Sequence, residues 1–349
     1  MTVKHGAFLF GQAAIAPGEI RTIDLPLSLL SNHTPMTLPV RVVHGKRPGP
    51  VVFLSAAIHG DEILGVEIIR RVLKSKGLEK LRGTVLAVPI VNSYGFLAHS
   101  RYLPDRRDLN RFFPGSEKGS LTARLADLFL SEIVKRCEFG IDLHTAAVHR
   151  TNYPQLRYDA KASPRLRELA DAFGAPVVMQ APLRAGSLRE AAKENGVEIL
   201  LYEAGEALRF DEFAIRVGVR GVLSVFQALG MVPARTVSKP ARPPVLSRSS
   251  YWLRAPQGGI MRAHKNIGDL VHPGETIGYI GDPIGDFESE IRSTDPGIIV
   301  GRTNLPVVNQ GDALFHIARL KNLSEAESRV GSVSDEIESH PLFDEDEIL

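Results

Sequence analysis

The sequence predicts an α/β domain with a mainly parallel sheet flanked by helices, followed by a smaller all-β domain. Between residues 50 and 230, apolar runs of strand length alternate with segments in which apolar residues recur at helical spacing. After Gly230 the chain becomes rich in Pro and Arg, a composition typical of a linker. Beyond residue 250, short β-type runs alternate with Gly-containing turns.

The composition argues against several classes of protein. The formal net charge is +2 and no long basic run is present, so the charge pattern of a nucleic-acid binder is missing. We expect no membrane span and no export, because the chain lacks both the roughly 18 consecutive apolar residues of a span and a signal-peptide pattern. The single cysteine, Cys137, cannot form an internal disulfide, which suits a reducing cytoplasm.

The elements follow in order from a β-rich entry segment, residues 1–48, which ends in an edge-strand pattern. An unbroken apolar run over 50–58 then predicts a strand covered on both faces by helices. From Asp61 the apolar residues recur at helical spacing, and we expect Gly77 to provide the C-cap of this helix. Further strands are predicted over 84–91, 139–143 and 197–202, and further helices over 121–136, 164–174 and 211–229.

The predicted domains are a catalytic α/β domain over 1–235, a Pro-rich linker over 236–249, a β-module over 250–320 and an acidic, mobile tail over 321–349. The linker marks an independent boundary, so the α/β domain is expected to fold without the residues that follow it.

His59 and Glu62 stand where the strand over 50–58 ends and its helix begins, the edge of an α/β sheet where ligands usually bind. A catalytic zinc site has about three protein ligands and one position open to water. His144 is the candidate third ligand, because parallel strands bring their carboxyl ends to the same edge. Asp142 is its candidate hydrogen-bond partner. Alone, a His and a Glu at this spacing also fit a surface turn with a helix-capping acid.

A basic loop over 100–115 provides a second group of polar side chains. An Arg beside an Asn, as in Asn110 and Arg111, is suited to binding a substrate carboxylate or stabilising an oxyanion. The alternative is a solvated loop held by Asp105 and Asp108.

Glu203 follows the strand over 197–202 and reaches the same edge of the sheet. A carboxylate there could act as general base and then as general acid. A strand-end salt bridge is the structural alternative.

Together these motifs resemble the succinylglutamate desuccinylase and aspartoacylase family, within the zinc carboxypeptidase-like clan. The matching segments are His59-Gly-Asp-Glu62, Asp108-Leu-Asn-Arg-Phe-Phe-Pro-Gly115, Asp142-Leu-His144 and Glu203-Ala-Gly205, in the family's order. The resemblance covers residues from about 50 to 230, and the chain is also similar to bacterial members that carry a C-terminal β-module.

The resemblance implies a carboxypeptidase-like catalytic domain with one zinc ion per chain. The implied site residues are His59, Glu62 and His144 as zinc ligands, Asn110 and Arg111 for a substrate carboxylate, Arg101 for the scissile carbonyl and Glu203 for the attacking water. Arg106 and Arg107 compete with Arg101 for its role, because the loop that carries them is longer than in aspartoacylases.

The β-module resembles the barrel-sandwich fold of biotinyl and lipoyl carriers. It lacks a lysine at a recognisable carrier hairpin, so we expect no covalent cofactor. We interpret it as a lid, a substrate-gating element or an oligomerisation element, and the oligomeric state, including a homo-oligomer, stays open.

The function expected from these residues is zinc-dependent hydrolysis of a small-molecule substrate, an N-acyl amino acid or related amide. A metallocarboxypeptidase that trims a peptide or glutamyl tail needs the same zinc and carboxylate clamp. A non-catalytic, metal-free binding protein is the alternative of another class, although ligands, base and clamp are all present in the sequence.

Overall fold

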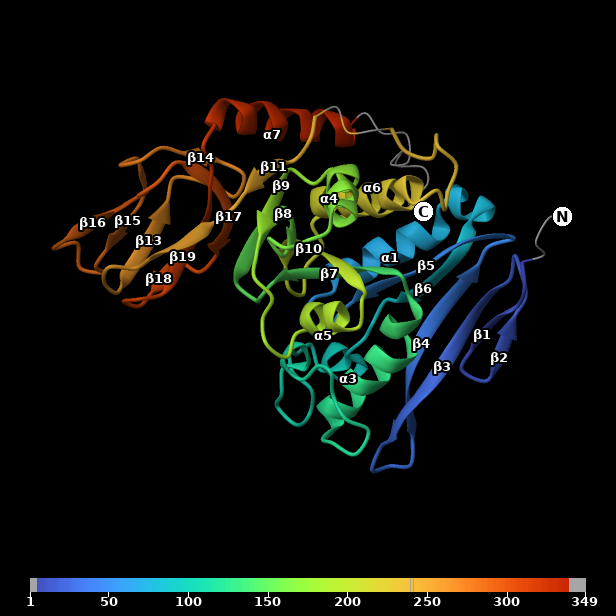
Figure 1. Cartoon of the computed structure of the whole chain (residues 1–349). Helices are drawn as coiled ribbons and strands as arrows, with labels where there is room; N and C mark the ends of the chain where they lie inside the picture. Colours follow the sequence, from blue (N-terminus) through green and yellow to red (C-terminus); the bar gives the residue numbers. More distant parts are fainter. Residues whose placement is uncertain (1–4, 239, 241, 339–349) are drawn as a thin grey trace.

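The structure is a computed structural model that describes residues 5–238, 240 and 242–338 (Figure 1). The strands up to residue 206 are β1 (Phe8–Phe10), β2 (Ala13–Ile15), β3 (Ile20–Leu29), β4 (Pro35–His44), β5 (Arg47–Ala56), β6 (Arg82–Val88), β7 (Phe139–Ala146), β8 (Arg150–Tyr158), β9 (Val177–Gln180) and β10 (Glu198–Glu206). The helices between them and just after are α1 (Leu64–Lys74), α2 (Ser93–Leu97), α3 (Leu121–Glu132), α4 (Pro164–Phe173), α5 (Leu188–Glu194) and α6 (Glu212–Ala228).

The C-terminal part adds nine short strands and one helix to the described chain. They are β11 (Val245–Ser247), β12 (Ser250–Arg254), β13 (Gly259–Ala263), β14 (Leu270–Val271), β15 (Thr276–Gly281), β16 (Glu288–Arg292), β17 (Gly297–Thr303), β18 (Val307–Val308), β19 (Ala313–Arg319) and α7 (Leu323–Glu338). None of the helices in the described residues is long and apolar enough to cross a membrane.

A 13-stranded sheet forms the centre of the molecule, with its main path in the order β12-β19-β17-β8-β10-β7-β5-β6-β4-β3. Along this path only the middle strands, β6, β5, β7 and β10, run parallel to one another. The sheet as a whole is therefore mixed, and the parallel majority predicted for the α/β domain is not confirmed. The main reason is β8: it starts four residues after β7 ends, a connection too short for a parallel crossover, and it runs antiparallel to β10.

Helices cover both faces of the central strands (Figure 1). Along β5, the side chains of Val52 and Leu54 join the core under α1, α4 and α6, whereas Phe53 joins the core on the side of α3. This alternation confirms a strand that is buried on both faces. The Gly77 prediction is wrong, because α1 ends at Lys74 and Ser75, in an extended conformation, is its C-cap.

The β-module continues the catalytic sheet rather than forming a separate body. Strand β17 pairs with β8, and the Gln155 side chain of β8 donates a hydrogen bond to the Val300 carbonyl oxygen at 3.1 Å. Strand β11 pairs with β9, and Val177 shares a hydrophobic cluster with Ile298. A shared sheet and a shared core therefore cross the predicted boundary. The four-stranded sheet β16-β15-β13-β18 is the part that extends away (Figure 1).

Most of the predicted mobile tail forms a helix. Val333 and Ile337 of α7 are buried in the core cluster that also contains α6. The Arg329 guanidinium is 1% exposed and donates a hydrogen bond to the Gly174 carbonyl oxygen at 2.6 Å. The prediction missed these contacts because the apolar residues of α7 are outnumbered by polar ones that face outward. Residues 339–349 lie outside the described residues.

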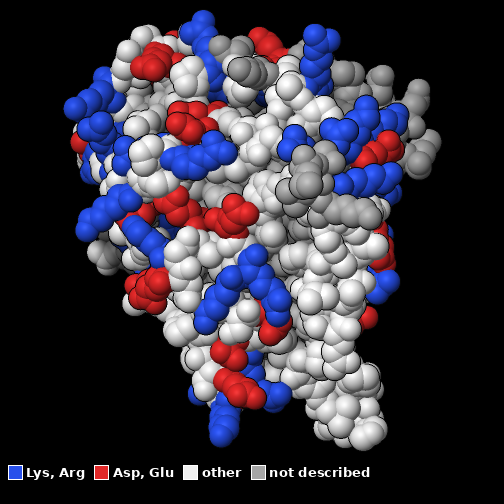
Figure 2. Space-filling view, turned by 45° about the vertical axis from the view of Figure 1, so that its right-hand side comes forward, with Lys and Arg blue, Asp and Glu red and all other residues white. Residues whose placement is uncertain are grey.

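Charged side chains are mixed on the face shown in Figure 2, where Lys and Arg lie among Asp and Glu. On this face, no broad area of a single sign stands out among the described residues.

Candidate metal centre and substrate cavity

The three predicted ligands come from two neighbouring strands. His59 and Glu62 lie between β5 and α1, and His144 lies on β7, which pairs in parallel with β5. The turn is tight: a Cβ on Gly60 would lie 2.0 Å from the carbonyl carbon of Gly95, so only glycine fits there. The carboxyl ends of β5 and β7 therefore bring the three side chains together.

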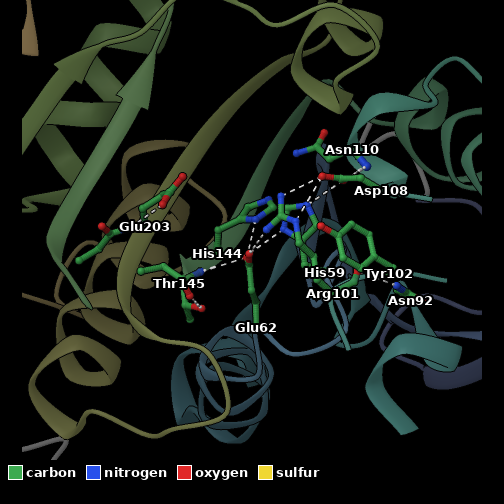
Figure 3. A network of polar contacts seen from close by, with 12 residues as sticks. His59, Glu62, Asn92, Arg101, Tyr102, Asp108, Asn110, His144, Thr145 and Glu203 are labelled. Atoms are coloured by element: carbon green, nitrogen blue, oxygen red, sulfur yellow. Dashed lines mark hydrogen bonds and ion pairs between the residues drawn. The ribbon is translucent and has the colours of Figure 1, made fainter. Parts of the chain in front are cut away.

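Glu62 joins the two histidines. Its Oε1 lies 2.6 Å from Nδ1 of His59, and its Oε2 lies 2.7 Å from Nδ1 of His144 (Figure 3). All three residues are buried, and their ligand atoms lie within 4.8 Å of one another. Burial excludes the exposed surface turn that was the alternative. Two imidazoles and one carboxylate are a ligand set of catalytic zinc sites.

Two aspartates hold the far nitrogens of the imidazole rings. Nε2 of His59 lies 3.0 Å from Oδ1 of Asp108, and Nε2 of His144 lies 2.8 Å from Oδ2 of Asp142. Ser55 donates a hydrogen bond of 2.7 Å to the other oxygen of Asp142. Each carboxylate can accept a hydrogen bond from an N–H at Nε2, which leaves Nδ1 for a ligand bond, the arrangement typical of metal-binding histidines. The residues therefore fit a metal ion.

The charges of this cluster are strongly coupled. Burial alone would raise the pKa of Glu62, but His59 and His144 outweigh it and hold the pKa well below its usual range. Burial lowers the pKa of each histidine, whereas the neighbouring carboxylates outweigh it and raise both values above 6.5. Without a cation, protons on the imidazoles compensate the carboxylates. A divalent cation would replace those protons.

The cluster opens into a cavity of about 270 Å³. Arg101 lines it, with Nη1 at 3.2 Å from Glu62 and Nη2 at 2.9 Å from Asp108. Arg107 instead lies over the ring of Phe112 and, like Arg106, is not a cavity residue. Of the three arginines left open by the sequence, only Arg101 faces this space.

Asn110 and Arg111 also line the cavity. They belong to a short 3₁₀ turn, Leu109–Arg111, and the Asn110 side-chain oxygen accepts a hydrogen bond of 2.9 Å from the amide of Leu188. This contact fixes the side-chain amide and leaves its NH₂ group as a donor for an anion. Asp108 forms an ion pair with Arg101 within the loop, as the alternative interpretation of the loop expected. The loop is therefore held in place by its aspartate and also lines the cavity.

Glu203 lies on β10 directly beside His144 in the register of the two strands, and it lines the cavity. Asn152 donates a hydrogen bond of 2.7 Å to its Oε2, and Arg157 approaches its Oε1 at 3.3 Å. The structure thus contains the strand-end ion pair that was the structural alternative, and the same carboxylate also lines the cavity beside His144.

Sequence reasoning missed much of the cavity wall. Seven arginines and three carboxylates line the cavity, and the residues that the sequence did not single out include Arg150, Asn152, Arg157, Arg184, Arg189, Trp252 and Arg302. The excess of Arg between residues 150 and 189 is visible in the sequence and is a signal that could have drawn attention to an anion site.

Trp252 and Arg302 come from the β-module. The Trp252 ring stacks on His316 with centroids 4.6 Å apart, and the Arg150 guanidinium lies 5.5 Å from the centre of the same Trp252 ring. Burial, together with the nearby charge of Arg157, lowers the pKa of His316 to about 3, so this imidazole is neutral at pH 7. The module therefore contributes an aromatic and cationic wall to the cavity.

The fold is α/β, with a mixed sheet that is covered by helices. A buried His–Glu–His cluster lies at the carboxyl ends of its central strands, and this is a ligand set found in metallohydrolases. The sequence model of the succinylglutamate desuccinylase/aspartoacylase catalytic domain matches residues 48–229. The chain belongs to this family, which confirms the resemblance found in the sequence.

Related proteins extend beyond that domain. An N-alpha-acetyl-L-2,4-diaminobutyric acid deacetylase of Halomonas elongata is 28% identical over 81% of this chain and 86% of its own length. A succinylglutamate desuccinylase of Vibrio campbellii is 24% identical over 66% of this chain and 71% of its own length. A crystal structure of a succinylglutamate desuccinylase/aspartoacylase from Rhodobacter sphaeroides, 27% identical, superimposes with a TM-score of 0.74 over 86% of this chain and 94% of the other.

Proposed function

We propose that the chain is a cytoplasmic, zinc-dependent amidohydrolase of the zinc carboxypeptidase-like type, which deacylates an N-acyl amino acid or related small amide. The observation that carries this proposal is the buried cluster of His59, Glu62 and His144, which opens into a cavity lined by Glu203 and several arginines. The names of the Halomonas and Vibrio relatives, a deacetylase and a desuccinylase, support an amide as the substrate.

His59 and His144 would hold one zinc ion through Nδ1, and Glu62 through its carboxylate. A bound zinc ion supplies Lewis acidity for the scissile carbonyl and for the attacking water. Asp108 and Asp142 keep the two imidazoles in the tautomer that this binding requires.

Glu203 takes a proton from the attacking water and later gives it to the departing amine. Asn152 and Arg157 hold its two oxygens, so the carboxylate keeps one orientation beside His144. The proton that leaves the water therefore stays next to the bond that breaks.

Asn110 and Arg111 bind the carboxylate of the amino-acid part of the substrate, and Arg101 faces the oxyanion that develops on the carbonyl. The contacts of Arg101 with Glu62 and Asp108 fix its guanidinium before the substrate arrives. Arg101, Asn110 and Arg111 all line the one cavity, so a single small N-acyl amino acid can contact them together.

The test is a hydrolysis screen of the zinc-loaded full-length protein against acetyl-, succinyl- and glutamyl-amino acids, with release of free amine as the readout. We expect release that a chelator abolishes and added zinc restores. Release that is insensitive to metal would contradict the mechanism, and preference for longer peptides would favour a carboxypeptidase. Absence of release from any of the substrates by zinc-loaded protein would reject the proposed function.

A further inference from the structure

We infer that Gly301 of the β-module sets the position of the Glu203 carboxylate, and that it acts through the side chain of Asn152. Gly301 lies on β17 and Asn152 on β8, the neighbouring strands through which the module joins the catalytic sheet (Figure 1). Gly301 does not line the cavity, so it is a positioning residue. The inference rests on the proposed function, because it explains how the general base of that reaction is held.

Asn152 makes the shorter of the two contacts that hold Glu203. Its Nδ2 donates a hydrogen bond of 2.7 Å to Oε2, whereas Nη1 of Arg157 approaches Oε1 at 3.3 Å. Asn152 is buried, so water does not readily replace this contact. A carboxylate oxygen only accepts hydrogen bonds, and the amide must therefore turn its NH₂ group toward Glu203 and its oxygen away.

The oxygen of this amide faces Gly301. The two residues are partners in the strand register, and a Cβ on Gly301 would lie 2.8 Å from Oδ1 of Asn152. The next neighbours of that Cβ, in His316 and Thr151, would lie at 3.4 and 3.5 Å, which is ordinary van der Waals contact. The φ angle of Gly301 is not in the left-handed region. Space for the Asn152 amide, rather than backbone conformation, is therefore what requires a glycine here.

Strand β17 is held in place beside β8. Two side-chain hydrogen bonds join the strands next to this pair, from Gln155 to the Val300 carbonyl oxygen at 3.1 Å and from Asn304 to the Thr151 hydroxyl at 2.6 Å. Strand β19 pairs with the other edge of β17. If a methyl group were added at position 301, the amide side chain would yield rather than the strand, and its NH₂ group would turn away from the carboxylate.

A general base depends on its orientation. A misplacement of about 1 Å, even one caused by a distant substitution, can cost about 10²-fold in rate. The residues proposed to bind the substrate, Asn110 and Arg111, lie on another loop and do not contact Gly301. Loss of the Asn152 contact should therefore lower kcat and leave KM nearly unchanged.

A double-mutant cycle tests this inference on the zinc-loaded full-length protein, with the best substrate of the hydrolysis screen. We expect Gly301→Ala and Asn152→Ala each to lower kcat about tenfold or more, with KM changed by less than about twofold. The double variant should be no slower than Asn152→Ala, because the methyl group then has no amide to displace. Losses that multiply, or a higher KM with unchanged kcat, would overturn the inference.

Gly281→Ala is the matched control. Gly281 is also a strand glycine of the β-module, and a Cβ there would lie 3.4 Å from its nearest neighbour, the Phe287 carbonyl oxygen, so kcat should be retained. Asn152→Leu keeps the branched shape of the side chain without its N–H donor and should lose kcat. Retention of kcat in Asn152→Leu would show that the hydrogen bond does not position Glu203. If Gly301→Ala does not fold even together with Asn152→Ala, the methyl group meets more than the amide and the inference is wrong.

Crystal structures separate this inference from the proposed function. In zinc-loaded Gly301→Ala, Nδ2 of Asn152 should lie more than about 3.5 Å from Oε2 of Glu203, beyond hydrogen-bond distance. A contact that stays at 2.7 Å would overturn the inference, whatever the activity. If the wild-type protein hydrolyses no substrate, the proposed function fails, and this distance still decides whether Gly301 sets the position of the carboxylate.

Discussion

One cavity is lined by the cluster of His59, Glu62 and His144, here called the metal side, and by a group of arginines, here called the distal side and defined by Arg150, Arg157 and Arg302. The polar groups of the two sides are satisfied differently. Both ring nitrogens of His59 and of His144 face carboxylates, and both oxygens of Glu62 face histidines. On the distal side, the buried Nε of Arg157 has no hydrogen-bond partner among the described residues, and both hydrogen bonds of Arg302 use its Nη1. Side chains that are hydrogen-bonded to one another form a preorganised site for a permanently bound ion. Donors without a protein partner are instead available to a ligand that binds reversibly.

Removal of the whole β-module is the change with the largest expected effect. Deletion of residues 245–349 takes β17 away from β8, β11 away from β9, and Val333 and Ile337 out of the core beside α6. We expect the truncated protein to be insoluble, or to lack a cooperative melting transition by circular dichroism, and to lose zinc binding with its fold. A truncated protein that melts cooperatively and holds one zinc per chain would show that the two sides fold independently.

A single substitution at a proposed ligand should remove metal binding alone. The His144→Ala variant leaves two ligands, which hold the ion too weakly, so zinc content should fall from about one per chain to near zero and activity should be lost. Metal analysis after gel filtration is the measurement. His272→Ala, at an exposed histidine of the β-module, is the control and should keep its zinc. Full metal occupancy in His144→Ala would remove this residue from the site.

Glu203 stands between the two sides, since it lies beside His144 and contacts Arg157. If Glu203 is the general base and acid, the Glu203→Gln variant should have a turnover number lower by about 10²–10⁴, with zinc content and substrate affinity nearly unchanged. Glu206→Gln, on the same strand but outside the cavity lining, should retain turnover. A purely structural Glu203 would lower the melting temperature and spare turnover, and a fourth metal ligand would lower zinc content.

The smallest effect concerns protons on the metal side. Because carboxylates raise the pKa of His59 and His144 above 6.5 in the metal-free protein, zinc must displace protons from them at neutral pH. Zinc affinity should therefore rise with pH between 6 and 8, by up to about tenfold per pH unit for each proton displaced. Competition with a chromophoric chelator measures this slope. Asp142→Asn should move the dependence to lower pH, and a pH-independent affinity would contradict the coupling.

The proposed metal ligands could be predicted from the sequence because the information that points to them is local. An apolar run, a His and a Glu three residues apart and a second His at the end of another strand are enough, since parallel strands align their carboxyl ends. The alternation of strands and helices over residues 50–230 followed from the same patterns. Asp142 was placed beside His144 by the two-residue period of a strand, and the structure confirms that contact.

The distal side could not be predicted in this way. Strand β8 contains Pro154 and polar residues at buried positions, so its pattern does not indicate a buried strand. Its partner β17 lies about 150 residues further along the chain, and such pairing leaves no trace in a local pattern. Helix α7 was missed although its apolar residues recur at helical spacing, because acidic and other polar residues outnumber them and favoured the interpretation as a tail.

The pairing of β17 with β8 also sets the order in which the protein can mature during synthesis. Residues 150–158 leave the ribosome long before residues 297–303, so the nascent chain carries Arg150–Asn152 of β8, the part that β9 does not pair with, as an open sheet edge until β17 has been made. Such an edge is a template for wrong partners. A ribosome that stalls within the β-module therefore releases a chain with every proposed zinc ligand and an unclosed sheet, a species that chaperones and proteases can distinguish from the finished enzyme.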